Sequence, residues 1–206
     1  PPSWNIYADT QDKKGEEART SPEFPDECLA TPSECEDIKA LRKLLGTALT
    51  EGRHAQYPEV VGDISLLRFL RGNKGNIEAA AGLFHDHLET RRKFKMDDCR
   101  DRCVTQMFSP GGIKFHQEQM IYGSLVREFL PMEYNCGMTI RGDPVCAVYY
   151  TGGRLSRVLR EHGREKVLEF TVETFVRRQI QLDILSRYQG RLVRLVCFMQ
   201  CLGGLW

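Results

Sequence analysis

Long hydrophobic runs are absent from this sequence, and their absence excludes a membrane-spanning helix. The longest apolar stretch, LVCFMQCLGGLW at residues 195–206, is well short of the roughly 20 residues that such a helix needs. The chain starts with PPSW, without an initiator methionine or the charged, apolar and small-residue layout of a signal peptide. We therefore expect that residue 1 is not the biological start.

Motifs of known catalytic chemistry are also missing. The sequence contains no HExxH, GxSxG, P-loop or GxGxxG pattern, and its five histidines show no metal-ligand spacing. His85 and His87 lie two positions apart on a predicted helix, where side chains point to different faces. We therefore predict that the protein is not an enzyme and has no catalytic residue, no metal site and no cofactor.

Eight cysteines are present, but their pattern does not indicate a disulfide framework. A chain of 206 residues is long enough to form a hydrophobic core without such crosslinks. The two CxxxC pairs, which begin at Cys99 and Cys197, lack the second pair of ligands that a zinc site uses. Cys146 and Cys197 lie in apolar runs, where cysteine behaves as a small hydrophobe. We expect reduced thiols in a cytoplasmic protein.

Charge is nearly balanced, with a formal net charge of +1, but it is unevenly distributed. Acidic side chains outnumber basic ones over residues 1–62, and the reverse holds over residues 141–206. The basic excess suits an anionic membrane surface or an acidic partner, but it is too small for a nucleic-acid-binding protein. Alternatively, it is a solvated helix face balanced by Glu161, Glu165, Glu169 and Glu173. The arginines expected to be exposed are Arg154, Arg157, Arg160, Arg164, Arg177, Arg178, Arg187 and Arg191.

The sequence has the composition of an ordinary globular protein, with 41% hydrophobic and 28% charged residues. In its first half, apolar residues follow the spacing of helices. Residues 1–33 are polar and proline-rich, which predicts a disordered tail. Beyond them, Asn76 is a good N-cap after the break at GNKG. Apolar side chains recur at helical spacing and predict a helical lobe over residues 34–100. Their stripes contain Ile38, Leu41, Leu44, Leu45, Ala48, Ile64, Leu66, Leu67, Phe69, Leu70, Ala80, Leu83, Phe84 and Leu88.

The second half of the sequence predicts a buried sheet. Residues 144–151, PVCAVYYT, and 192–200, LVRLVCFMQ, are apolar on both faces, which is typical of strands covered on two sides. A long helix over residues 164–190 separates them, which implies a crossover and a mostly parallel sheet. A further helix is expected near residues 123–131, ending at Pro131. One face of the long helix contains Leu168, Val172, Phe175, Gln179, Leu182 and Leu185.

Several of these segments resemble the CRAL-TRIO lipid-binding proteins, which include phosphatidylinositol-transfer proteins and retinaldehyde- or tocopherol-binding proteins. Three segments are similar to motifs of that family's helical lobe: ALRKLL at 40–45, LLRFLRGNK at 66–74 and ETRRKF at 89–94. GDPV at 142–145 and VCFMQCLGG at 196–204 are similar to motifs of its lipid domain. The resemblance covers about residues 35–204.

The resemblance implies a mixed α/β fold, in which the helical lobe over residues 34–100 supports a lipid-binding domain over residues 101–206. That domain would contain a partial, mostly parallel sheet with a long crossover helix. The family's domain continues with further strands and a gating helix. We therefore expect the chain to be incomplete at its C-terminus, as a fragment, a truncated gene product or a shortened isoform.

The resemblance also implies a function, namely lipid binding and intermembrane lipid transfer. A phospholipid or other hydrophobic molecule would occupy a cavity, and the cytoplasmic protein would associate transiently with an anionic membrane as a peripheral protein. Which face of each strand looks into the cavity stays open. The candidate lipid-binding residues are Val145, Ala147, Tyr149, Val193, Leu195, Cys197 and Lys74.

Three positions depart from the family pattern. Gln200 stands where the family usually has Asp, Gly75 where it has an aromatic residue, and Asn73 at a basic position of the headgroup site. Phosphoinositide recognition relies on charge-assisted bonds from Arg or Lys, so Asn73 argues against inositol-lipid specificity. The alternative function is a protein-interaction or regulatory module of a signalling protein without lipid exchange. The sequence leaves the oligomeric state open.

Overall fold

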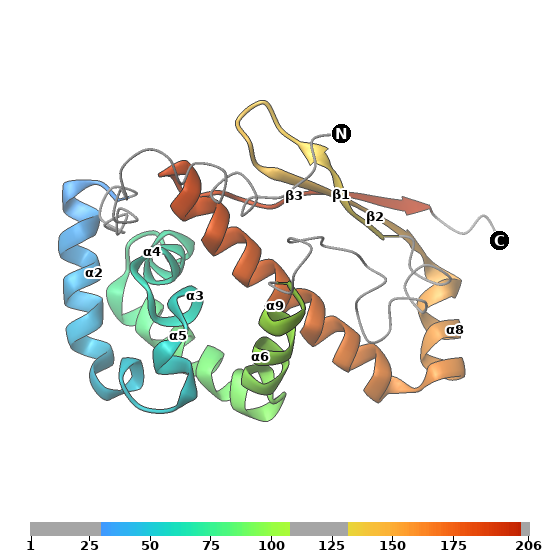
Figure 1. Ribbon diagram of the computed structural model, residues 1–206, viewed down its shortest axis with the longest axis horizontal. Coiled ribbons are helices and arrows are strands. Elements are labelled where there is room, and N and C mark those ends of the chain that lie inside the picture. Colours follow the sequence, from blue (N-terminus) through green and yellow to red (C-terminus); the bar gives the residue numbers. More distant parts are fainter. Residues whose placement is uncertain (1–29, 108–131, 203–206) are drawn as a thin grey trace, which may run out of the picture. The chain divides into compact units, whose positions relative to one another are not determined.

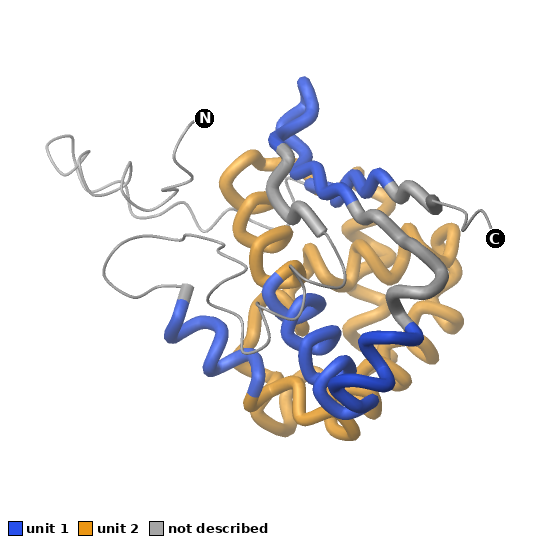
Figure 2. The backbone as a smooth tube through the Cα atoms, turned by 90° about the vertical axis from the view of Figure 1, so that its right-hand side faces the viewer, with its two compact units in different colours: residues 1–15, 99–177, 193–206 blue, residues 16–98, 178–192 orange. Residues whose placement is uncertain are grey.

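The computed structural model describes residues 30–107 and 132–202 (Figure 1). These residues form two compact units, which Figure 2 distinguishes by colour. The helical unit consists of residues 30–98 and 178–192, and the sheet unit of residues 99–107, 132–177 and 193–202. The division is therefore not linear in the sequence, because residues 178–192 belong with the helices of the first half.

The helical unit begins with a capped helix. The Thr31 hydroxyl accepts from the backbone N–H of Glu34 at 3.3 Å, and the Glu34 carboxylate accepts from the Thr31 N–H at 2.9 Å. This reciprocal arrangement satisfies two backbone donors that a helix start leaves open. Most of the predicted tail lies outside the described residues, and α2 starts at Pro32. The elements of this unit are α2 (Pro32–Leu45), η2 (Gly46–Leu49), η3 (Arg53–Gln56), α3 (Pro58–Val61), α4 (Asp63–Gly72) and α5 (Ile77–Lys93).

The turn between α4 and α5 is built as the sequence predicted. The Asn76 side chain accepts from the N–H of Ala79 at 2.8 Å, which confirms Asn76 as the N-cap of α5. Lys74 and Gly75 adopt positive φ angles of 55° and 81°, and the N–H of Gly75 donates to the carbonyl of Leu70 at 2.8 Å. This left-handed turn ends α4 and lets the chain reverse.

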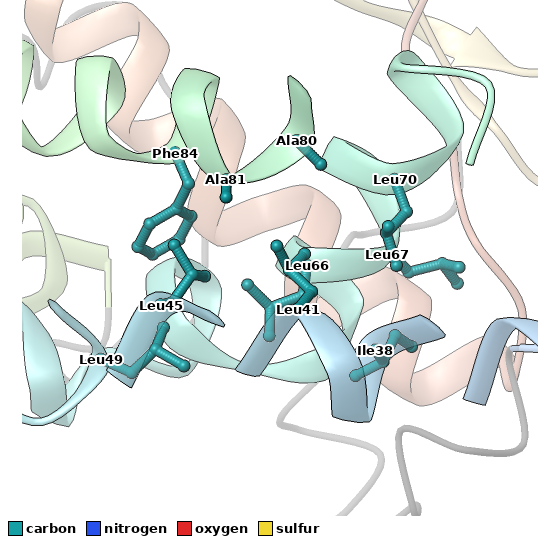
Figure 3. Packing of buried hydrophobic residues seen from close by; sticks show 10 residues of the cluster. All are labelled: Ile38, Leu41, Leu45, Leu49, Leu66, Leu67, Leu70, Ala80, Ala81 and Phe84. Carbon is teal, nitrogen blue, oxygen red and sulfur yellow. The ribbon is translucent and has the colours of Figure 1, made fainter. Parts of the chain in front are cut away.

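Three helices of this unit, α2, α4 and α5, share one apolar core (Figure 3). The predicted apolar stripes are largely confirmed. The prediction of burial is wrong for Leu44 and Leu83, which are 54% and 49% exposed. Each lies at the margin of its helix's apolar stripe, where a helix that packs on one side leaves the side chain in solvent. The core consists of Ile38, Leu41, Leu45, Leu49, Leu66, Leu67, Leu70, Ala80, Ala81 and Phe84.

The sheet unit contains three strands, which pair in the order β1–β2–β3. β1 pairs with β2 antiparallel and β2 pairs with β3 in parallel, so the sheet is mixed and not mostly parallel. The mixed α/β class and the crossover between parallel strands are confirmed. The helix predicted near residues 123–131 lies outside the described residues. The elements are β1 (Met132–Met138), β2 (Pro144–Thr151), α8 (Gly152–His162) and β3 (Val196–Leu202), while α6 (Met96–Met107) and α9 (Arg164–Gln189) contribute to both units.

The inward face of α9 agrees with the predicted one at Leu185, which is buried, but differs from it at other positions. Leu168 and Phe175 are 38% and 64% exposed, whereas Phe170, Glu173 and Val176 are buried. Apolar residues occur all round this helix, so its sequence periodicity does not select a face. The expectation of exposed arginines is likewise wrong at two positions, because Arg177 and Arg178 are buried.

Candidate functional site

The start of β3 is positioned by a side chain that precedes β2. Oδ1 of Asp143, a buried residue, accepts from the backbone N–H of Arg194 at 3.1 Å. This bond takes the N–H of Arg194 away from the strand ladder, and β3 begins two residues later, at Val196. The predicted strand over 192–200 therefore starts too early, and Val193, which is fully buried, and Leu195 precede the sheet.

The strand register sorts the remaining candidate residues into two faces. Val145 is paired with Val196 and Ala147 with Phe198. Paired residues of parallel strands project from the same side of a sheet, and neighbours along a strand project from opposite sides. Cys197, which is paired with Cys146, therefore lies on the opposite face from Val145 and Ala147. The predicted set does not share a single face.

The face that carries Val145 and Ala147 is apolar and partly open to solvent. Val145, Ala147 and Val196 are half-buried, and Phe198 is 64% exposed. The sequence predicted strands covered on both sides, and Phe198 contradicts this for β3. The reason is that β3 is an edge strand of the described sheet, so it lacks a neighbour on one side. Tyr149 belongs to β2, opposite Gln200.

The other face carries two thiols in contact. Sγ of Cys146 donates to Sγ of Cys197 across a distance of 3.2 Å. Cys146 is 3% exposed, whereas Cys197 is exposed. The prediction that both cysteines behave as buried hydrophobes is therefore wrong for Cys197.

A buried polar cluster joins α6 to α9 within the sheet unit. Arg177 donates from Nε and Nη2 to the Glu173 carboxylate at 3.0 and 2.8 Å, and it also bonds to the side chain of Gln106. On α6, Sγ of Cys99 and Sγ of Cys103 lie 3.9 Å apart. Their hydrogen bond lowers the pKa of Cys99 and raises the pKa of Cys103, so Cys103 keeps its proton. Because all these side chains except Gln106 are buried, the cluster has the character of a packed interior.

Lys74, the candidate basic residue, belongs to the helical unit, whereas the other candidates belong to the sheet unit. Its side chain is exposed, and its backbone forms the left-handed turn after α4. His87 of the same unit packs beside Phe69, with ring centroids 5.7 Å apart. Burial lowers the pKa of His87 to about 4, so the imidazole is neutral at pH 7. Lys74 and His87 therefore both belong to the helical unit and not to the set of candidate residues in the sheet unit.

Within residues 30–107 and 132–202, no group of three or more His, Cys, Asp or Glu side chains is arranged to hold a metal ion. In the same ranges, no helix combines the length and apolarity needed to cross a bilayer.

Comparisons of the chain with protein-family models, with curated proteins and with solved structures give no match. The resemblance to CRAL-TRIO proteins therefore rests on the sequence motifs alone.

Sequence reasoning missed two features of the sheet, namely the exposure of Phe198 and the bond by which Asp143 positions the start of β3. The alternation of Val196 and Phe198 was a readable signal that both lie on one face. The role of Asp143 depends on a contact with Arg194, 51 residues away, which no local pattern predicts.

Proposed function

We propose that the chain is a non-enzymatic lipid-binding module, in which the apolar face of β2 and β3 contacts the ligand. The observation that carries this proposal is the exposure of Phe198 beside Ala147, with Val145 and Val196 next to them on the same face. Apolar side chains that gather on one partly exposed face are a common mark of a binding site. Acyl chains match it, because they require contact area and no hydrogen bonds.

Two further features support the assignment of a lipid. β2 and β3 pair in parallel, and the helices α8 and α9 lie between them in the sequence. The CRAL-TRIO resemblance implies this strand–helix–strand order. Recognition of a phosphoinositide headgroup is not part of this proposal, since Asn73 stands where the resemblance implies a basic headgroup residue and Lys74 lies in the helical unit. We therefore propose a phospholipid or other hydrophobic ligand held mainly by its apolar part, with transfer between membranes as its use.

The alternative is a protein-interaction module, in which a partner covers the same face or pairs with the edge of β3. Main-chain hydrogen bonds to an edge strand provide a recognised mode of such binding. The two functions differ in the ligand that accompanies the purified chain, because only the first predicts a bound lipid.

A matched pair of phenylalanines tests the proposal. Phe198 and Phe175 are both 64% exposed and both belong to the sheet unit, but only Phe198 lies on the β2–β3 face. We expect Phe198→Ser to reduce binding of a fluorescent phosphatidylcholine, added in detergent-free buffer, by about tenfold, which corresponds to about 1.4 kcal/mol. Phe175→Ser should leave binding within about twofold. Equal losses in both variants would mean non-specific adsorption and would contradict the proposed face.

A further inference from the structure

Cys146 and Cys197 form a thiol contact that has no part in the proposed lipid binding. Cys146 on β2 and Cys197 on β3 are direct partners in the parallel register, and their sulfurs are 3.2 Å apart. Cys197 is exposed, so reagents in solution reach its sulfur, whereas Cys146 is 3% exposed. The pair thus combines one accessible thiol with one shielded thiol in contact with it.

The backbone separation of the pair suits a covalent bond between the sulfurs. Neighbouring strands lie about 4.8 Å apart, and disulfides join Cα atoms separated by about 4.4–6.8 Å. The sulfurs must close from 3.2 Å to a bond length of about 2.05 Å, which small side-chain rotations supply. The strands therefore do not need to separate or slide for the bond to form.

The second thiol pair, Cys99 and Cys103, provides a contrast. Their sulfurs are 3.9 Å apart, but the residues are one turn apart on α6 and are 5% and 0% exposed. Side chains one helical turn apart have Cβ atoms separated by about 5–6 Å, beyond the roughly 3.5–4.5 Å that a disulfide allows. Closing this pair would distort the helix, and oxidants do not reach it. Proximity of sulfurs is therefore not sufficient. Of these two pairs, only the strand pair combines a backbone separation suited to a disulfide with an accessible thiol.

We propose that Cys146 and Cys197 form a redox-sensitive dithiol, which a peroxide oxidises to an intramolecular disulfide between β2 and β3. The Cys197 thiolate attacks one peroxide oxygen, the O–O bond breaks, and hydroxide leaves a sulfenic acid on Cys197. The Cys146 thiolate then attacks Sγ of Cys197, forms the S–S bond and displaces the second oxygen as hydroxide. The two thiol protons convert both hydroxides to water, and the two electrons lost by sulfur reduce the peroxide.

The disulfide would covalently link β2 and β3, the two parallel strands that the crossover connects. It would link residues 51 positions apart and enclose α8 and α9. Closing a chain segment of this length reduces the entropy of the unfolded state, so we expect the melting temperature to rise by about 10 °C on oxidation. The thiols lie on the face opposite to Val145 and Ala147, so the proposal does not depend on lipid binding.

The test uses the full 206-residue chain, treated with a few equivalents of hydrogen peroxide and alkylated, then digested without reduction for peptide mass spectrometry. We expect a crosslinked peptide containing Cys146 and Cys197 in most chains, reversed by dithiothreitol, while Cys99 and Cys103 stay reduced. Cys197→Ser should abolish the crosslink, and the control Cys99→Ser should leave its yield unchanged. Cys146→Ser should leave a sulfenic acid on Cys197, which dimedone traps.

Three results would overturn the proposal. These are a crosslink from Cys197 to any other cysteine, a disulfide-linked dimer as the main product, and over-oxidation of Cys197 while Cys146 still reacts with the alkylating reagent. Cys197 is exposed, so its serine variant decides the outcome even where Cys146→Ser does not fold.

Discussion

The helical unit and the sheet unit both bury apolar and charged side chains, but of the described phenylalanines only those of the sheet unit include largely exposed ones. In the helical unit, leucines such as Leu41 and Leu66 are fully buried. The sheet unit buries the Glu173–Arg177 ion pair, each residue 1% exposed, and leaves Phe175 and Phe198 64% exposed. Aromatic side chains contribute most to stability when buried, so largely exposed phenylalanines are candidates for contact with a ligand. For this reason we propose a scaffold role for the helical unit and a ligand surface on the sheet unit.

The largest effect is expected where the helical core is broken. Leu67→Asp puts a carboxylate at a fully buried position of α4, and we expect a loss of at least about 4 kcal/mol and of the cooperative thermal transition. Leu44→Asp, at a 54% exposed position of α2, should cost less than about 0.5 kcal/mol. Thermal unfolding followed by circular dichroism measures both, and similar melting temperatures in the two variants would refute the scaffold role.

The next effect concerns the buried charges of the sheet unit. Glu173→Ala removes the carboxylate that neutralises buried Arg177, and we expect a loss of about 3 kcal/mol. The control is Glu161→Ala on α8, which removes an exposed pair with the same (i, i+4) spacing to Arg157 and should cost less than about 0.5 kcal/mol. Urea unfolding gives both values. A small effect at Glu173 would mean that burial of the pair does not raise the cost of removing its carboxylate above that of an exposed pair.

The smallest effect concerns the ion pair between α2 and α4 in the helical unit. Arg71 donates to the Glu34 carboxylate at 2.7 and 2.9 Å, and these bonds, with that from the Thr31 N–H, lower the pKa of Glu34 from 4.5 to about 2. The folded state therefore holds this proton more weakly than the unfolded state. The stability it provides is present above pH 4.5 and is lost as the pH falls toward 2.

The size of this contribution is limited by solvent, because both side chains of the pair are partly exposed. We expect Glu34→Gln to cost about 1 kcal/mol at pH 7. The difference from the unsubstituted chain should shrink between pH 4.5 and about 2, measured by urea unfolding across that range. A difference that stays constant with pH would exclude the ion pair as its source.

The sequence predicted the helical unit better than the sheet unit, for a physical reason. The N-cap at Asn76 and the burial of Leu66, Leu67 and Leu70 follow from local spacing, since neighbours on a helix are three or four residues apart. The strand faces depend on register between distant segments. One shifted residue reverses the face of a whole strand, so the spacing along each strand left open the face on which Cys197 lies relative to Val145.

The candidate site was predictable only as a pair of strands. The sequence identified the apolar runs around Ala147 and Cys197, but not that an edge position exposes Phe198. It also could not reveal that Arg177 is buried, because its ion pair with Glu173 follows the spacing of a solvated helix face. Only the packing of α9 distinguishes the two cases.

The central claim is that the sheet face of β2 and β3 holds a lipid, and one measurement tests it most directly. Organic extracts of the purified monomeric chain are analysed by mass spectrometry, with lipid quantified per chain. We predict one enriched lipid class at close to one molecule per chain, and its loss in Phe198→Ser but not in Phe175→Ser. A monomeric, cooperatively melting chain that carries no enriched lipid would contradict the claim and favour a protein-interaction module.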